Sequence, residues 1–410
     1  MRILLPSSGG RETSLAWRFS KDGHKVFTDS RANPGMLVFA EKIPNLDRDK
    51  PESILYAAEH NQIDLTVIGG ETMLKRGIVN MFDEFGLPIV GGTAKMARLE
   101  TSKWDCCKLL EKAGVKIPKT AYCEGLAAVM RELEGREEAV IKPDGDTLGK
   151  GVVVMASLRE KDAAIEHVSA YPGRFLIQDL IRGREISFFV AANNRKKAFL
   201  GSGADYKLLN GKMTGGMGGY SPHELLTDEL FGRIMDEVVE PVLAVCEYRG
   251  LLYFQLMITP DGEIYVIEIN VRFGDPEAQL LTPLYRGDLA SVLASTCKGR
   301  VLDSSGFGVE DMCTFGYVLA AAGYPDKAQT GEPINGLGSI FDISQYVFQA
   351  GTKSSERGVV TDGGRVLAVV GKRQTYAKAK DSAERARNRI SFAGMQFRYD
   401  IGEHLFQEAN

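Results

Sequence analysis

The sequence predicts a multidomain protein of mixed α/β and α+β architecture, and three observations support this fold class. The chain has 410 residues, more than a single hydrophobic core usually organises. Hydrophobic residues make up 44% of the chain and charged residues 25%, which fits a globular protein and excludes disordered, fibrous and membrane classes. Apolar runs alternate with amphipathic helical runs over the first hundred residues, and a mixed strand and helix pattern follows.

The N-terminal segment, residues 1–102, has the alternating pattern of a parallel sheet with right-handed crossovers. The expected elements are strands at 2–5, 25–27, 65–68 and 88–90, and helices at 12–20, at 51–59 and in a segment that ends near Phe85. Three strands run into glycine-rich turns at 7–12, 69–71 and 91–93. Ligands bind at the carboxyl ends of such strands, so we expect a Rossmann-like domain that binds a substrate.

The middle segment, residues 103–300, has an α+β pattern, and the C-terminal segment, residues 301–410, is expected to form a small mixed β domain. The expected elements of both are strands at 139–142, 152–155, 186–191 and 365–370, and helices at 103–114, 228–248 and 375–390. The first two of these strands enclose a long glycine-rich loop. This arrangement predicts a hairpin within a mobile lid of about residues 117–190.

Charge and cysteine usage narrow the functional classes. The formal net charge is −4, so nothing attracts the chain to nucleic acid in general, and no run of residues is apolar enough to span a membrane. The six cysteines show no Cys-x-x-Cys spacing, so we expect reduced thiols, and any metal should be bound by oxygen. The first residues lack the apolar core of a signal peptide. We therefore expect a cytoplasmic monomer or homodimer whose partners are small-molecule substrates.

A strand-borne lysine followed by a glycine-rich loop is the first candidate for chemistry. Lys142 ends an expected strand, and the loop after it contains Gly145, Gly149, Lys150 and Gly151. Backbone N–H groups and lysine ammonium groups in this arrangement suit the oxygens of a triphosphate. The order of glycine and lysine is not that of a P-loop. An ordinary polar hairpin loop would give the same local pattern, so both interpretations stay open from these residues alone.

A second candidate lies on one face of an expected strand. Side chains alternate along a strand, so Glu268, Asn270 and Arg272 share a face while the residues between them are apolar and suit a core. A carboxylate, an amide and a guanidinium in this order can hold Mg²⁺ through oxygen and meet a transferring phosphoryl or acyl-phosphate group. Paired charges on a solvated strand face are the alternative interpretation.

Several longer motifs carry a family resemblance. The matching segments occur in order over nearly the whole chain: Gly9-Gly-Arg-Glu12, Leu99-Glu-Thr-Ser-Lys103, Ile141-Lys142, Gly149-Lys-Gly151, Thr214-Gly-Gly-Met-Gly218, Tyr220-Ser-Pro222, Val266 to Glu277, Ala322-Gly-Tyr-Pro325 and Gly363-Gly-Arg-Val366. With these motifs the chain resembles the glycinamide ribonucleotide synthetases, also called phosphoribosylamine–glycine ligases, of the ATP-grasp superfamily. The resemblance implies an ATP-grasp domain over residues 103–300.

The resemblance also implies a site for ATP and a divalent metal. The implied ATP-binding residues are Lys103, Lys142, Gly149, Lys150 and Gly151 at the phosphates, Gln178, Asp179, Leu180 and Ile181 at the adenine hinge, and Glu185 at the ribose hydroxyls. Glu268 and Asn270 match the ligands of Mg²⁺ or Mn²⁺. Gln255 falls where many ATP-grasp enzymes place another metal carboxylate, and its amide is a weaker metal ligand.

The phosphorylated amine is implied at the N-terminal loops, with help from the Arg272 segment. The implied substrate-binding residues are Gly9, Gly10, Arg11, Glu12, Glu71, Asp205, Gly215, Gly216, Met217, Arg272 and Asp275. A glycine turn at a helix N-terminus also suits a phosphate group on physical grounds. A dinucleotide site is the alternative, because Asp29 lies about where a ribose-binding acid would fall, although the G-x-G-x-x-G order is absent.

Some substrate-binding segments depart from the family pattern. Thr13 and Tyr206 stand where the family usually has histidines, and Gly70 lies in a loop that usually reads Gly-Pro-Glu. Acidic residues of the hinge have become Gln178 and Asp179, and the segment 208–213 is shorter than the usual loop before Thr214. We expect the ATP chemistry to be kept while these loops decide which amine and carboxylate are joined.

The expected reaction is an ATP-dependent ligation, a step of purine biosynthesis in which glycine becomes an acyl phosphate that 5-phosphoribosylamine attacks. Lys142 and Lys150 would offset developing charge, and Arg272 would stabilise the intermediate. Three alternatives stay open: a related ligase of a specialised pathway with a different amino acid or amine, a carboxylase of the same superfamily, and a non-catalytic nucleotide-binding regulator. The complete Glu268, Asn270 and Arg272 set argues against the regulator.

Overall fold

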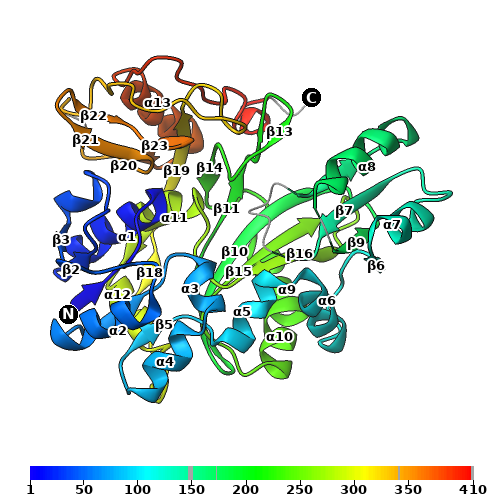
Figure 1. Ribbon diagram of the computed structural model, residues 1–410, viewed down its shortest axis with the longest axis horizontal. Coiled ribbons are helices and arrows are strands. Elements are labelled where there is room, and N and C mark those ends of the chain that lie inside the picture. The colour runs from blue at the N-terminus through cyan, green and yellow to red at the C-terminus, as the bar shows by residue number, and fades with distance from the viewer. Residues whose placement is uncertain (146–150, 172, 340–341, 408–410) are drawn as a thin grey trace.

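The N-terminal sheet is parallel throughout, as the sequence predicts (Figure 1). The structure, a computed structural model, describes residues 1–145, 151–171, 173–339 and 342–407. The strand order is β3-β2-β1-β4-β5. The strands are β1 (Arg2–Leu4), β2 (Lys25–Thr28), β3 (Ala40–Lys42), β4 (Leu65–Val67) and β5 (Ile89–Val90). The predicted Rossmann-like sheet is therefore confirmed.

Helices of the same segment pack around this sheet, and two of them begin at its glycine-rich edge. They are α1 (Gly10–Lys21), α2 (Pro51–His60), α3 (Glu71–Lys75), α4 (Ile78–Glu84) and α5 (Ala94–Thr101). In α1, Leu15, Ala16 and Phe19 repeat at helical spacing and are buried in one core cluster. The strands β1 and β4 lead into the N-termini of α1 and α3, so the turns at Gly9 and Gly70 lie at one edge of the sheet.

A separate antiparallel sheet forms the segment that the sequence predicts as a lid, on the right of Figure 1. Its order is β6-β9-β7-β8. The elements are β6 (Thr120–Glu124), α7 (Leu126–Glu132), β7 (Ala139–Pro143), β8 (Val153–Met155), α8 (Lys161–Ser169) and β9 (Arg174–Gln178). Ala139 pairs with Met155, which confirms the predicted hairpin. The lid has its own hydrophobic cluster around Ile141 and Phe175, and its mobility stays a prediction.

An eight-stranded sheet joins the middle and C-terminal segments, in the order β16-β15-β10-β11-β14-β19-β23-β20. Its strands are β10 (Arg184–Asn193), β11 (Lys196–Asp205), β14 (Gly218–Ser221), β15 (Arg249–Ile258), β16 (Ile264–Asn270), β19 (Cys313–Ala320), β20 (Gln345–Gln349) and β23 (Arg365–Arg373). Tyr220 of β14 pairs with Phe315 of β19, so the sheet continues past residue 300. The C-terminal segment is therefore attached to the sheet that carries Glu268 and Asn270.

The remaining elements cover this sheet or connect its strands. They are α6 (Lys103–Lys112), α9 (Asp228–Ile234), α10 (Glu240–Val245), α11 (Glu277–Leu281), α12 (Leu289–Ala294), α13 (Tyr376–Arg387), the strand pairs β12 (Leu208–Leu209) with β13 (Lys212–Met213), β17 (Tyr285–Arg286) with β18 (Gly308–Val309) and β21 (Thr352–Ser355) with β22 (Gly358–Thr361), and short 3-10 turns at Met36–Val38, Leu158–Glu160, Thr282–Leu284 and Glu403–Leu405. The helix predicted at 228–248 is interrupted by a π turn at Met235–Val239. The final helix starts after Thr375, whose hydroxyl accepts a hydrogen bond from the Lys378 N–H at 3.3 Å.

The cysteines and the helices have two further features. All six cysteines are free thiols, and five of them are buried. In the part of the chain that the structure describes, none of the helices combines the length and the apolar run needed to cross a membrane.

Candidate active site

Lys142 lies near the carboxyl end of β7, with its ammonium group directed at strand β16. The residue is 7% exposed, and Nζ donates a hydrogen bond to the carbonyl of Ile267 at 3.3 Å. Burial lowers the pKa of the Lys142 ammonium, and the nearby Glu268 carboxylate opposes this shift. Among the described residues, the ammonium group thus has one long hydrogen bond to set against the cost of burial, which leaves donors suited to phosphate oxygens.

The N-terminus of α6 holds the beginning of the lid loop. Lys103 Nζ donates to the carbonyl of Gly145 at 3.0 Å. The Asp144 carboxylate accepts from the backbone N–H of Trp104 at 3.3 Å, at the positive end of the helix dipole. The predicted loop residues Gly149 and Lys150 lie outside the described residues, and Gly151 is buried where the description resumes. The structure therefore places Lys142 on β7, just before the lid loop, and Lys103 against the first residues of that loop.

Glu268 and Asn270 lie together on one face of β16, as the alternation predicts. Asn270 Nδ2 donates to Glu268 Oε1 at 3.3 Å. Burial raises the pKa of the Glu268 carboxyl, but the ammonium groups of Lys207 and Lys142 outweigh burial and hold it below its usual value. Within the described ranges, no group of three His, Cys, Asp or Glu side chains is arranged to hold a metal ion. A carboxylate and an amide oxygen suit Mg²⁺ when phosphate oxygens and water complete the coordination.

Gln255 pairs with Glu268 across β15 and β16, but its side chain is committed elsewhere. Its Nε2 donates to Glu185 Oε2 at 2.9 Å, and its Oε1 accepts from the Tyr253 hydroxyl. Glu185 also accepts from Lys207 Nζ at 3.3 Å. Burial lowers the pKa of the Lys207 ammonium, yet Glu185 and Glu268 raise it overall. Lys207 is a site cation that the sequence analysis missed, although it directly follows Asp205-Tyr206.

The predicted adenine hinge follows the end of β9. Gln178 is buried, and its Nε2 donates to Thr120 Oγ1 at 2.9 Å. Its buried Oε1 has no hydrogen-bond partner among the described residues, so this acceptor suits an amino group of a ligand. The Asp179 carboxylate accepts from Arg136 Nη1 at 2.8 Å, and Leu180 and Ile181 are half-buried. The hinge therefore offers a free amide oxygen and an occupied carboxylate.

Arg272 joins three segments through its guanidinium group. Nε lies 3.2 Å from Glu71 Oε2, Nη2 lies 2.7 Å from Glu100 Oε1 and 3.4 Å from Asn270 Oδ1, and Nη1 donates to the Phe273 carbonyl at 3.1 Å. Burial lowers the pKa of Arg272, but Glu100 and Glu71 raise it overall. The guanidinium thus faces two carboxylates, an amide oxygen and a backbone carbonyl. The catalytic role expected for Arg272 stays a prediction.

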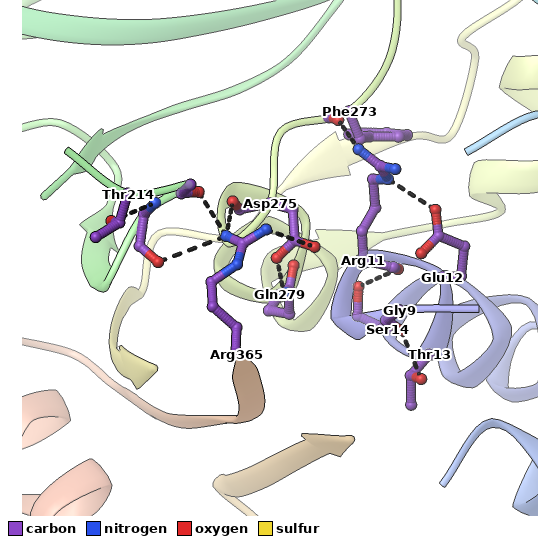
Figure 2. Close-up of polar contacts among 12 residues, drawn as sticks. Gly9, Arg11, Glu12, Thr13, Ser14, Thr214, Phe273, Asp275, Gln279 and Arg365 are labelled. Atoms are coloured by element: carbon purple, nitrogen blue, oxygen red, sulfur yellow. Dashed lines mark hydrogen bonds and ion pairs between the residues drawn. The ribbon is translucent and has the colours of Figure 1, made fainter. Parts of the chain in front are cut away.

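The first glycine turn closes around the carboxylate of Glu12. Arg11 Nε donates to Glu12 Oε1 at 2.9 Å, and Arg11 Nη1 donates to the carbonyl of Phe273 at 3.0 Å (Figure 2). A Cβ at Gly9 would lie 2.7 Å from Glu12 Oε2, and a Cβ at Gly69 would overlap the same carboxylate. Glycine at both positions leaves room for the Glu12 carboxylate, and Arg11 links this turn to the segment after β16.

Thr13, one of the departures from the family pattern, faces another domain. It is 1% exposed, and its Oγ1 lies 2.8 Å from the Gly9 carbonyl and 2.7 Å from the carbonyl of Gln349 at the end of β20. Asn33 Nδ2 donates to the same Gln349 oxygen at 3.1 Å. One turn further along α1, Trp17 packs edge-on against Tyr346. The hydroxyl of Thr13 thus belongs to the contact between the N-terminal domain and β20.

Tyr206 and the short segment after it also contact the C-terminal part of the chain. The Tyr206 hydroxyl accepts from the Gly402 N–H at 2.9 Å, and the Arg398 guanidinium lies 4.9 Å from the centre of its ring. Arg398 Nη1 donates to the carbonyl of Leu208 at 3.1 Å. The segment 208–213 forms the two-stranded pair β12 and β13. These contacts account for the tyrosine and the short loop without any substrate.

The Gly215–Gly216 turn lies beside Asp205 and the Asp275 segment. Gly216 has φ +108°, and a Cβ there would lie 2.7 Å from Asp205 Oδ1. Burial raises the pKa of the Asp205 carboxyl well above its usual range, and Glu277 adds to the shift. Asp275 Oδ2 lies 3.3 Å from Arg365 Nη2. Met217 is buried next to the turn, and Gly10 lies against Gln279, whose amide donates to Asp275 Oδ1 at 2.7 Å.

Sequence models of one family match the chain in three consecutive parts. The phosphoribosylglycinamide synthetase N domain matches residues 1–100, its ATP-grasp domain matches 101–278, and its C domain matches 314–404.

Relatives of similar length agree with these matches. The chain is 35% identical over 422 residues to the phosphoribosylamine–glycine ligase of Neisseria meningitidis serogroup B, covering 98% of this chain and 99% of that one. It is 36% identical over 424 residues to the phosphoribosylamine–glycine ligase of Pseudomonas aeruginosa, covering 98% and 97% of the two chains.

Solved structures share the architecture. The phosphoribosylamine–glycine ligase of Thermotoga maritima superposes with a TM-score of 0.83 at 27% identity, over 98% of this chain and 100% of that one. A biotin carboxylase of Campylobacter jejuni reaches 0.77 at 15% identity over 96% and 92% of the chains, which shows a common fold. The chain belongs to the phosphoribosylglycinamide synthetase family of ATP-grasp ligases.

Proposed function

We propose that this protein is an ATP-dependent ligase that joins glycine to 5-phosphoribosylamine and releases ADP and phosphate. Membership of the family supports the reaction class. The structural observation that supports the chemistry is the incompletely compensated ammonium of Lys142 above the Glu268 and Asn270 pair. A buried cation facing an oxygen-donor pair under a separate lid suits a triphosphate and a divalent metal ion.

In the first step, the γ-phosphoryl group of ATP transfers to the carboxylate of glycine and ADP leaves. Lys103 and Lys142 contact the phosphates, and Gln178 and Glu185 receive the nucleoside. Glu268 and Asn270 would hold Mg²⁺ or Mn²⁺, and the bound ion would neutralise charge on the transferring group. Lys142 is already dehydrated by burial, so it can stabilise new negative charge without reorganising water.

In the second step, the amine of phosphoribosylamine attacks the carbonyl carbon of glycyl phosphate, the C–O bond to phosphate breaks, and the amine loses a proton. An acyl phosphate reacts readily with an amine held beside it, so the protein needs to position the amine rather than supply a nucleophile. We assign this positioning to the turn of Arg11 and Glu12, whose arginine already contacts the segment after β16. Closure of the lid keeps water from the intermediate.

The departures from the family pattern at Thr13 and Tyr206 give no ground for a second substrate pair. Thr13 contacts Gln349, and Tyr206 contacts the C-terminal segment at Gly402. Both side chains are therefore explained by contacts within the protein.

The proposal is tested by product analysis with the purified protein, ATP, Mg²⁺, glycine and freshly prepared 5-phosphoribosylamine. We expect one glycinamide ribonucleotide, identified by mass, for each ADP and phosphate formed. Alanine and serine in place of glycine, ammonia in place of the amine, and bicarbonate as a carboxylase substrate serve as comparisons. No product with the glycine pair, together with ADP formation from another pair, would overturn the assignment.

A further inference from the structure

Two sequence motifs of the C-terminal domain converge on the Gly215–Gly216 turn of the middle domain. The motifs are Ala322-Gly-Tyr-Pro325 and Gly363-Gly-Arg-Val366, which supply Tyr324 and Arg365. Neither residue is used by the two reaction steps described above. The turn that they contact lies between Asp205 and the Asp275 segment, next to the predicted substrate-binding residues.

Arg365, at the start of β23, holds the turn against the segment after β16 (Figure 2). Its Nη1 donates to the carbonyls of Gly215 and Asp275, at 2.5 Å each, and lies 3.5 Å from the Gly216 carbonyl. Its Nη2 lies 3.3 Å from Asp275 Oδ2. One planar guanidinium thus connects three backbone carbonyls and a carboxylate from two separate loops. An ammonium group cannot reproduce this geometry.

Tyr324 holds the same turn from its donor side. The N–H of Gly215 donates to the Tyr324 hydroxyl at 3.2 Å, while the carbonyl of Gly215 accepts from Arg365. A Cβ at Gly364 would overlap the Tyr324 ring, so glycine beside Arg365 is what admits the tyrosine. The two motifs therefore depend on each other. Together they hydrogen-bond both the N–H and the carbonyl of Gly215.

The turn itself cannot shift without disturbing predicted substrate-binding residues. Gly216 has φ +108°, and a Cβ there would lie 2.7 Å from Asp205 Oδ1 and 2.5 Å from Pro276 Cδ. Thr214 anchors the turn's other end, because its Oγ1 donates to the Lys207 carbonyl at 2.6 Å. Movement of the turn would thus change the position of Asp205, while Thr214 keeps the end of the turn next to Lys207 in place.

We infer that Arg365 and Tyr324 are positioning residues by which the C-terminal domain sets the Gly215–Gly216 turn for the acid and amine substrates. The inference rests on the proposed function, since it names residues that shape the same site. Their direct partners are the turn and Asp275. The hinge at Gln178 and Asp179 contacts other residues, Thr120 and Arg136. Loss of either positioning group therefore alters use of glycine and the amine while nucleotide binding is kept.

The test compares Arg365→Lys and Tyr324→Phe with the wild-type enzyme in full kinetics for ATP, glycine and the amine, and in direct binding of ADP. We expect kcat/KM for glycine and the amine to fall tenfold or more in Arg365→Lys, about fivefold in Tyr324→Phe, and ADP affinity to stay within twofold. Tyr324→Phe keeps the ring against Gly364 and removes only the hydroxyl. It therefore tests the positioning role even if Arg365→Lys folds poorly.

A matched control and a rescue separate positioning from folding. Arg357 also donates to a carbonyl of the C-terminal domain, that of Gly331 at 3.0 Å, but it is exposed, so Arg357→Lys should leave all kinetic constants unchanged. Ethylguanidinium should restore part of the rate of Arg365→Ala. Unchanged glycine and amine constants in both variants, or an equal loss of ADP affinity, would overturn the inference.

The wild-type reaction is measured first, so the two proposals fail separately. If the wild-type enzyme joins another substrate pair, the proposed function fails. The Arg365 and Tyr324 comparison is then made with that pair, and its outcome decides the positioning role.

Discussion

The nucleotide side of the site and the junction between the domains use buried charge in opposite ways. On the nucleotide side, Lys142 has a hydrogen bond of 3.3 Å to a carbonyl, and Glu268 accepts one of 3.3 Å from Asn270. At the junction, Arg272 contacts two carboxylates and Arg365 contacts three carbonyls and a carboxylate. The charge of Lys142, which the protein compensates poorly, is left for a ligand, while the charges of the two arginines hold segments together.

The pKa shifts express the same difference. Burial lowers the pKa of Lys142 even with Glu268 nearby, so the protein does not fully compensate its charge. Burial also lowers the pKa of Arg272, but Glu100 and Glu71 more than reverse the effect. Variants on the nucleotide side should therefore lose activity before stability, and variants at the junction should lose stability as well.

Lys142→Met is expected to give the largest effect on activity. It removes a dehydrated cation from the phosphate site, so kcat should fall about 10²- to 10³-fold. The free energy of unfolding, measured with urea, should change by less than about 1 kcal/mol, because a buried charge is exchanged for an apolar side chain of similar length. Lys353→Met, which removes an exposed lysine paired with Asp362, is the control and should change neither quantity. A large loss of stability in Lys142→Met would contradict the claim that the protein compensates the charge of Lys142 poorly.

Arg272→Met is expected to give the largest effect on stability. It leaves the carboxylates of Glu100 and Glu71 buried without their common partner, at a cost of about 3–5 kcal/mol in the free energy of unfolding. Denaturant unfolding measures this cost. Adding Glu100→Gln should recover part of it, because one of the unpaired charges is then removed. If the double variant is no more stable than Arg272→Met, the ion pair between Arg272 and Glu100 does not contribute to stability.

Asp275→Asn tests the junction through pH. Burial raises the pKa of the Asp275 carboxyl, but Arg365 and Arg11 outweigh burial and lower it from 3.8. The carboxylate therefore adds stability above pH 3.8, and this contribution is lost as pH falls through the lower folded pKa. At pH 7 the variant should be less stable by roughly 1–3 kcal/mol, and the difference should narrow below pH 4. A difference that does not vary with pH would exclude the ion pair with Arg365.

Thr13→Val should have the smallest effect. It removes the hydroxyl that bridges α1 and β20, so the free energy of unfolding should fall by about 1 kcal/mol. The value of kcat/KM for the amine should stay within twofold of wild type. Thr13→Ser keeps the hydroxyl and should behave as wild type in the same measurements. A specific rise in KM for the amine in Thr13→Val would instead place Thr13 in the substrate site.

Local patterns in the sequence predict the parts of the site that come from one continuous segment. The hairpin of β7 and β8 and the shared face of Glu268 and Asn270 follow from alternation and spacing, and both are confirmed. The π turn in the helix after Asp228 leaves no such signal. The roles assigned to individual site residues stay predictions.

Contacts between distant segments were beyond the reach of these patterns. Glu100 and Arg365 were missed because their partners are 172 and 90 residues away in the chain. Each lies in a motif, Leu99 to Lys103 or Gly363 to Val366, but the motif does not reveal what the side chain contacts. For the same reason, the sequence suggests that Thr13 alters the substrate site, although its hydroxyl contacts the Gln349 carbonyl at the end of β20.

The most direct test of the proposed ligation follows oxygen from glycine to phosphate. Glycine labelled with ¹⁸O in its carboxylate is incubated with the enzyme, ATP, Mg²⁺ and 5-phosphoribosylamine, and the phosphate is analysed by mass spectrometry. An acyl-phosphate route transfers one labelled oxygen to each phosphate, with one glycinamide ribonucleotide formed beside it. Unlabelled phosphate, or labelled phosphate without that product, would contradict the ligation of glycine to this amine.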